Sequence, residues 1–135
     1  MAKEKHAATF LGGGTGLSYV GEHAYAFSKR AGANVTPVVA LDFKTGAHYI
    51  RGSFHLSVAL QDGDVSSAAS YSNIDLNGQG VANMWAGFGA ADAMALSQIE
   101  IIIPPNTTVT ANLYSDENQA TRYMFISFVG RVYDA

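Results

Sequence analysis

Four histidines, His6, His23, His48 and His55, are the side chains best suited to act as a general base or a metal ligand. Paired histidines that bind a metal on a helix usually recur at i and i+4 beside an acidic residue. None of the four has this spacing, and no serine follows a strand in a nucleophile-elbow pattern. We therefore predict no catalytic residue, no metal ligand and no cofactor, and expect that the chain is not an enzyme.

The glycine run Gly12-Gly13-Gly14-Thr15-Gly16 invites comparison with phosphate-binding loops. Such a loop requires a Gly-Lys-Ser/Thr continuation and a helix that starts directly after it. No lysine follows here, and residues 17–20 favour a strand. We interpret the glycines as a hinge.

Two short acidic runs, Asp62-Gly63-Asp64 and Asp116-Glu117-Asn118, offer closely spaced oxygen ligands for a cation. Neither run has the spacing of a known calcium loop. We predict plain turns at both places, and a surface cation shared between subunits stays open as an alternative.

Aromatic side chains suggest a second kind of binding chemistry, because their flat apolar faces can stack on sugar rings. The candidates for such a platform are Trp85, Tyr71, Phe88 and Tyr114. In a β-sandwich the same residue types often fill the core or an interface. Both interpretations stay open, and Trp85 and Tyr71 are the candidate glycan-stacking residues.

Charge is scarce in this chain of 135 residues, with 14% charged and 48% hydrophobic residues. Soluble globular chains average about 25% charged residues. The shortage predicts that part of the surface is covered by self-association or docking. The formal net charge is -3 and the longest basic stretch is Lys29-Arg30, so we expect no nucleic-acid partner.

Cysteine is absent, which excludes a disulfide framework and any thiolate chemistry. The apolar run after Lys5 is too short for a signal-peptide core. The run Ile99–Ile103 contains Glu100 and is far shorter than the roughly 20 residues that span a bilayer. We predict synthesis in a reducing cytoplasm and no membrane partner.

The first 21 residues form a distinct region, in which five glycines separate large apolar side chains. Glycine at this density disfavours regular structure, yet a free tail seldom carries so many apolar residues. We predict an irregular N-terminal arm, residues 1–21, that orders against its own subunit or a neighbour, followed by a β-sandwich domain, residues 22–135. The candidate protein-interface residues of the arm are Phe10, Leu11, Leu17, Tyr19 and Val20.

The rest of the chain follows strand periodicity. Apolar residues alternate with polar ones over residues 53–60, which predicts a strand with one buried face. Asn77-Gly78 predicts a hairpin with a slightly long turn, and Pro104-Pro105 predicts a strand end. Residues 123–133 are apolar on both sides, which predicts a strand that is central or covered by a neighbour. Residues 90–96 are expected to form one helical turn. In total we predict an all-β, jelly-roll-like sandwich of about eight antiparallel strands.

Several segments resemble small virion proteins of tailed bacteriophages, most of all head-decoration (cement) proteins. These segments are Ile103-Pro104-Pro105-Asn106-Thr107-Thr108-Val109, Phe128-Val129-Gly130-Arg131-Val132-Tyr133, Gly21-Glu22-His23-Ala24-Tyr25-Ala26-Phe27-Ser28 and Leu41-Asp42-Phe43-Lys44-Thr45-Gly46. Together they cover about a third of the sequence and carry no site motif.

The resemblance implies a non-enzymatic structural protein that is made in the bacterial host cytoplasm and located in the virion, on the capsid surface. It implies binding to the outside of a phage capsid, stabilisation of contacts between major capsid protein subunits, and assembly as a homodimer or homotrimer. The alternative is a carbohydrate-binding or receptor-binding module of a phage tail or fibre.

Overall fold

The computed structural model describes residues 16–28, 31–33, 35–60, 70–86, 94–115 and 119–133, which form strands and turns and no helix. The ten strands are β1 (Ser18–Val20), β2 (His23–Phe27), β3 (Ala31–Ala33), β4 (Val38–Lys44), β5 (Tyr49–Leu60), β6 (Ser70–Leu76), β7 (Gln79–Ala86), β8 (Met94–Ile103), β9 (Thr108–Ser115) and β10 (Gln119–Tyr133). The predicted all-β class is confirmed. Within the described residues no helix is long and apolar enough to cross a bilayer.

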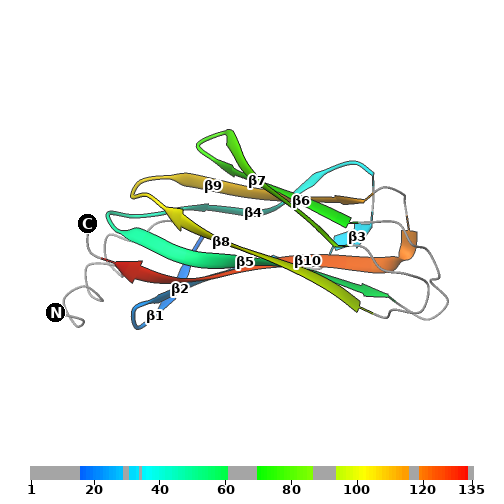
Figure 1. Ribbon diagram of the computed structural model, residues 1–135, viewed down its shortest axis with the longest axis horizontal. Helices are drawn as coiled ribbons and strands as arrows, with labels where there is room; N and C mark the ends of the chain where they lie inside the picture. Colours follow the sequence, from blue (N-terminus) through cyan, green and yellow to red (C-terminus); the bar gives the residue numbers. More distant parts are fainter. Residues whose placement is uncertain are drawn as a thin grey trace.

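The strands form two antiparallel sheets that face each other as the two layers of a sandwich (Figure 1). One sheet has the order β1-β2-β10-β5-β8, with β3 also paired to β10, and the other has the order β4-β9-β6-β7. Without β1 and β3, eight strands remain. The chain changes sheet between successive strands except from β6 to β7, which pair with each other, and this is the strand order of a jelly roll. The predicted fold is confirmed, and the short strands β1 and β3 account for the two strands beyond the expected eight.

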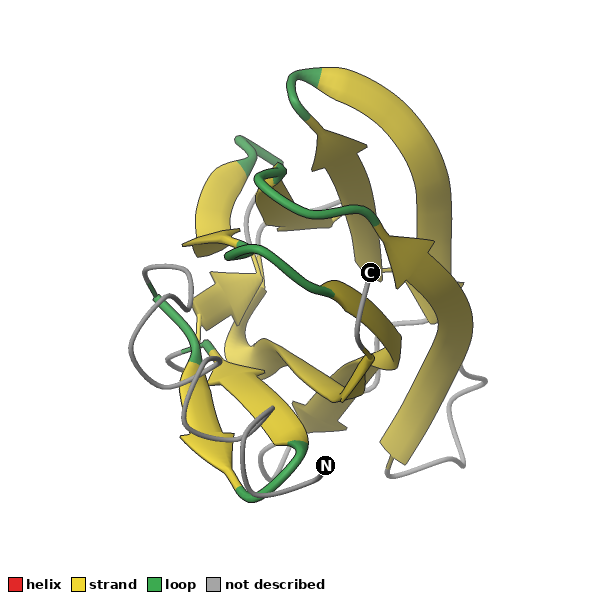
Figure 2. Ribbon diagram, turned by 90° about the vertical axis from the view of Figure 1, so that its left-hand side faces the viewer, coloured by secondary structure: helices red, strands yellow, loops and turns green. Residues whose placement is uncertain are grey.

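Every second residue of a strand points into the core between the two sheets. In Figure 2 the strands surround this interior. In β5 the even-numbered residues from Ile50 to Val58 point inward, and in β10 those from Met124 to Val132 do the same. Phe43 on β4 meets Phe54 and Phe128 across the interior, with ring centroids 6.5 and 5.2 Å from its own. β10 lies between β2 and β5, which confirms the predicted central strand.

The Asn77-Gly78 turn and the strand end before Pro104-Pro105 lie where the sequence predicts them. Asn77 and Gly78 have φ values of 52° and 79°, as a two-residue hairpin turn with two positive φ angles requires, so the turn is tighter than predicted. β8 ends at Ile103, directly before Pro104-Pro105, as predicted. The expected helical turn is wrong for residues 94–96, because they pair with β5 as the start of β8, and residues 90–93 lie outside the described part.

The last residues of the predicted arm belong to the sandwich. Ser18–Val20 form β1, which pairs antiparallel with β2 of the same chain. The expectation of irregular structure is therefore wrong for these three residues, since an edge strand of the chain's own sheet was available to pair with them. Residues 1–15, with the glycines from Gly12 to Gly14, lie outside the described part.

Thr45 ties the end of β4 to the segment between β8 and β9. Its buried Oγ1 donates to the carbonyl of Pro104 at 2.7 Å and accepts from the backbone N–H of Thr107 at 2.9 Å. Thr45→Val keeps the shape and leaves both backbone groups without that partner. We expect a loss of about 2 kcal/mol in the free energy of unfolding, measured by urea denaturation. The exposed Thr108→Val is the control; an equal, small effect of both changes would contradict this role.

Candidate functional site

Aromatic residues on three strands form a row across the outward side of the four-stranded sheet. Trp85 on β7 pairs in register with Tyr71 on β6, which pairs with Tyr114 on β9. The rings of Tyr71 and Tyr114 stack at 5.0 Å and 15°, whereas Trp85 is 61% exposed. The structure therefore brings the two predicted residues together as cross-strand partners, and one face of the Tyr71 ring is taken up by Tyr114.

Three asparagine side chains form a second row on the same three strands, two positions away from the aromatic residue of each strand. Asn83 Nδ2 donates to Asn73 Oδ1, and the backbone N–H of Asn73 donates to Asn112 Oδ1 at 3.0 Å. Backbone pairing of β6 with β9 is interrupted between Tyr71 and Ile74, and the side chain of Asn112 bridges this opening.

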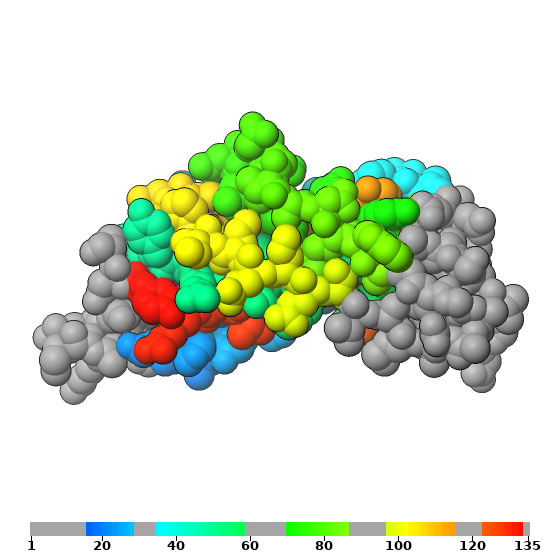
Figure 3. All heavy atoms as spheres, in the orientation of Figure 1, coloured from blue at the N-terminus to red at the C-terminus, as the bar shows by residue number. Residues whose placement is uncertain are grey.

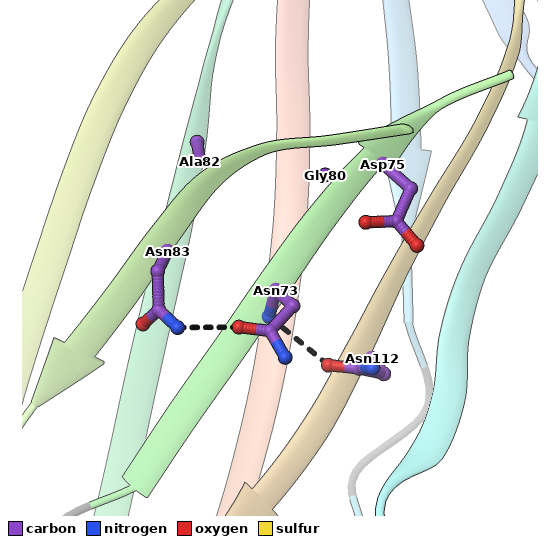
Figure 4. Close-up of a pocket in the computed structure, with 6 residues that line it drawn as sticks. All are labelled: Asn73, Asp75, Gly80, Ala82, Asn83 and Asn112. Carbon is purple, nitrogen blue, oxygen red and sulfur yellow. Dashed lines mark hydrogen bonds between the residues drawn. The ribbon is translucent and has the colours of Figure 1, made fainter. Parts of the chain in front are cut away.

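These amides line an open pocket with a volume of about 470 Å³, shown in Figure 4. Its lining residues are Asn73, Asp75, Gly80, Ala82, Asn83 and Asn112. Asp75 lies opposite Gly80, where a Cβ atom would come within 3.4 Å of Asp75 Oδ1. The β6–β7 hairpin that carries much of the pocket stands out above the rest of the molecule in Figure 3. We call the aromatic row and this pocket together the Trp85 face.

The outward side of the six-stranded sheet carries a different group of side chains. Phe27 is 68% exposed and stacks at 6.1 Å on Tyr25, its neighbour on the same side of β2. Val129 on β10 pairs with Tyr25, and the exposed Phe125 lies on the same side of β10. We call Tyr25, Phe27, Phe125 and Val129 the Phe27 patch.

Paired charges lie on the same sheet as the Phe27 patch. Arg51 on β5 contacts Glu100 on β8 at 3.1 Å, and Arg131 on β10 contacts Glu22 at 3.3 Å. The hydrogen bond that Arg51 donates to Glu100, together with the negative charge of Glu100, raises the pKa of Arg51. Arg131 also lies 5.6 Å from the ring centroid of Tyr133. Both arginine side chains are more than half exposed, so the ion pairs contribute little stability. They leave an apolar surface with neutralised charges beside it.

The candidate interface residues of the arm have separate locations. Leu17 and Tyr19 are half-buried and pack against the chain's own core, while Val20 is 66% exposed on the outward side. Phe10 and Leu11 lie outside the described residues. Contact of Val20 with another protein stays a prediction.

The candidate metal ligands lie apart from one another within the described part of the chain. There, no three His, Cys, Asp or Glu side chains are close enough together to hold a metal, and His23, His48 and His55 lie on β2, before β5 and on β5. His6, Phe88, Asp62-Gly63-Asp64 and Asp116-Glu117-Asn118 lie outside the described residues.

Comparisons with known proteins bear on the fold. No protein-family model matches the sequence, and no curated protein matches it. Among solved structures, Eiger TNF from S. frugiperda is similar with a TM-score of 0.49 and 7% identity, over 84% of this chain and 93% of that one. Dimeric latent PorU from Porphyromonas gingivalis is similar with a TM-score of 0.50 and 11% identity, over 91% of this chain and 14% of that one. At 11% identity the second similarity shows the fold alone.

Proposed function

We propose that this chain is a non-enzymatic virion structural protein that binds the outside of a phage capsid and stabilises contacts between major capsid subunits. The observation that carries the proposal is the Phe27 patch, an exposed aromatic cluster with paired charges on the same sheet. Protein interfaces are enriched in aromatic residues and arginine at their centres, with a polar rim. The resemblance of four segments to capsid decoration proteins supports the same function.

The mechanism is added contact area. A standard protein interface buries about 1,600 Å², and a small protein that bridges two subunits adds such an area at each contact without any chemistry. Repetition over a closed lattice raises the number of contacts that must break together. Strengthening of the shell then requires only a rigid domain with one surface that binds the capsid. We propose that this jelly roll is such a domain.

Self-association belongs to the proposal, as a homodimer or homotrimer. Low charge and exposed apolar residues on both sheets support it, including Val81 on β7 and Ile102 on β8. Light scattering of the purified chain gives its mass directly. A monomer at all concentrations would remove self-association from the proposal and leave capsid binding to be tested separately.

Phe27→Ser is expected to weaken binding to empty phage heads by roughly tenfold or more, because truncating a central aromatic residue of an interface typically costs over 1 kcal/mol. Co-sedimentation with heads of the phage that carries this gene, assembled without the chain, measures the effect. Val39→Ser is the matched control, because Val39 is equally exposed but lies on the other sheet. Equal binding of both variants and the wild type would rule out the Phe27 patch as the docking surface.

A further inference from the structure

We propose that the Trp85 face binds a neutral glycan, with one sugar ring stacked on Trp85 and its neighbour held in the pocket beside Asn73, Asn83 and Asn112. This site is separate from the Phe27 patch, because the two lie on opposite outward faces of the sandwich. The inference therefore goes beyond capsid binding and does not depend on it.

The stacking position is a single ring. Trp85 is 61% exposed, and it lies at one end of the aromatic row with Tyr71 as its cross-strand partner. Tyr71 and Tyr114 stack on each other, so one face of each ring is already in contact within the row. An aromatic face left open at the end of such a row can take the apolar face of one pyranose ring.

The pocket supplies both hydrogen-bond donors and acceptors. Asn83 Nδ2, Asn73 Oδ1 and Asn112 Oδ1 are engaged within the protein, and these bonds fix the three amide groups. Asn73 Nδ2 and Asn112 Nδ2 remain as donors, and Asn83 Oδ1 as an acceptor, with no bonded partner among the described residues. The carboxylate of Asp75 adds two acceptor oxygens beside them. A sugar hydroxyl donates one hydrogen bond and accepts others, so this mixture suits a row of hydroxyls.

The charged residues of this sheet favour a neutral ligand over an anionic one. In the described strands of the four-stranded sheet, Lys44 is the only cation, whereas Asp42 and Asp75 are both acidic. Asp75 lies inside the pocket, where it would repel a sulfate or carboxylate group. The surface therefore opposes acidic polysaccharides and nucleic acid and accepts uncharged hydroxyl-rich chains.

The fluorescence of Trp85 provides a direct test, because it is the only tryptophan in the chain. We would titrate the full chain with soluble dextran, mannan and galactan, and with dextran sulfate as the anionic comparison. The expected result is a saturable change in emission with at least one of the neutral polymers, unaffected by added salt. No change with any neutral polymer, or a salt-sensitive change with dextran sulfate alone, would overturn the proposal.

Variants separate the site from the other face. In affinity electrophoresis with the polymer that binds, Trp85→Ala and Asn83→Ala are each expected to weaken binding about tenfold. Both residues are exposed, so folding is expected to survive, which circular dichroism checks. Phe27→Ala is the matched control and is expected to bind like the wild type. Unchanged glycan binding by Trp85→Ala, or loss of capsid binding by that variant, would assign Trp85 another role.

Discussion

Replacing Phe128 with alanine is expected to lower the free energy of unfolding by about 4 kcal/mol, a typical cost for removing a buried phenylalanine. Its ring is fully buried, and its centroid lies 4.7 Å from that of Phe54 and 5.2 Å from that of Phe43. These three rings come from both sheets, so the change leaves a cavity in the middle of the sandwich. Guanidinium denaturation followed by circular dichroism measures the loss.

Phe125→Ala provides the control for Phe128→Ala. Phe125 is the same residue type on the same strand but points outward, where it is 36% exposed. We expect its loss to cost less than about 1 kcal/mol. Equal destabilisation by both changes would show that the two faces of β10 are assigned wrongly.

Gly52→Ala is expected to destabilise the fold by about 3 kcal/mol, at the upper end of the usual cost of overpacking. A Cβ atom at Gly52 would lie 2.6 Å from the carbonyl oxygen of Val129 and 2.7 Å from the Cα of Gly130. Backbone atoms of a central strand cannot move aside as a flexible side chain can. Gly52 and Gly130 are direct cross-strand partners beneath the ring of Phe128, and this close approach requires the missing side chains.

Gly80→Ala tests whether glycine itself or its location matters. Gly80 also lies in a strand, but an added Cβ atom would meet only Asp75 Oδ1, at an ordinary contact distance of 3.4 Å. We expect a change in thermal midpoint of a few degrees at most. If Gly80→Ala and Gly52→Ala lower the midpoint equally, the close packing at Gly52 is not the cause.

Strand periodicity in the sequence predicts much of this fold, because each strand's own residues decide which side is buried. The alternation over residues 53–60 locates β5, and Pro104-Pro105 locates the end of β8. The order of strands within each sheet has no such local signal. β10 lies between β2 and β5, and both of these strands are distant from it in the sequence. Only the packing of the complete chain determines this arrangement.

The candidate binding surfaces were harder to predict than the fold. Trp85 and Tyr71 are recognisable by residue type, but the amides of Asn73, Asn83 and Asn112 belong to three strands and meet only through their register. The Phe27 patch was missed for the same reason. Its one local signal is that residues 123–133 are apolar on both sides, which predicts a strand that is central or covered by a neighbour but does not locate Tyr25 and Phe27 beside it.

The co-sedimentation of the wild-type chain with empty phage heads tests the central claim most directly. The account predicts that bound chain rises with concentration and then saturates at a fixed ratio to the major capsid subunits. A chain that stays in the supernatant, or that pellets in proportion to its concentration without saturating, would contradict the proposed role on the capsid.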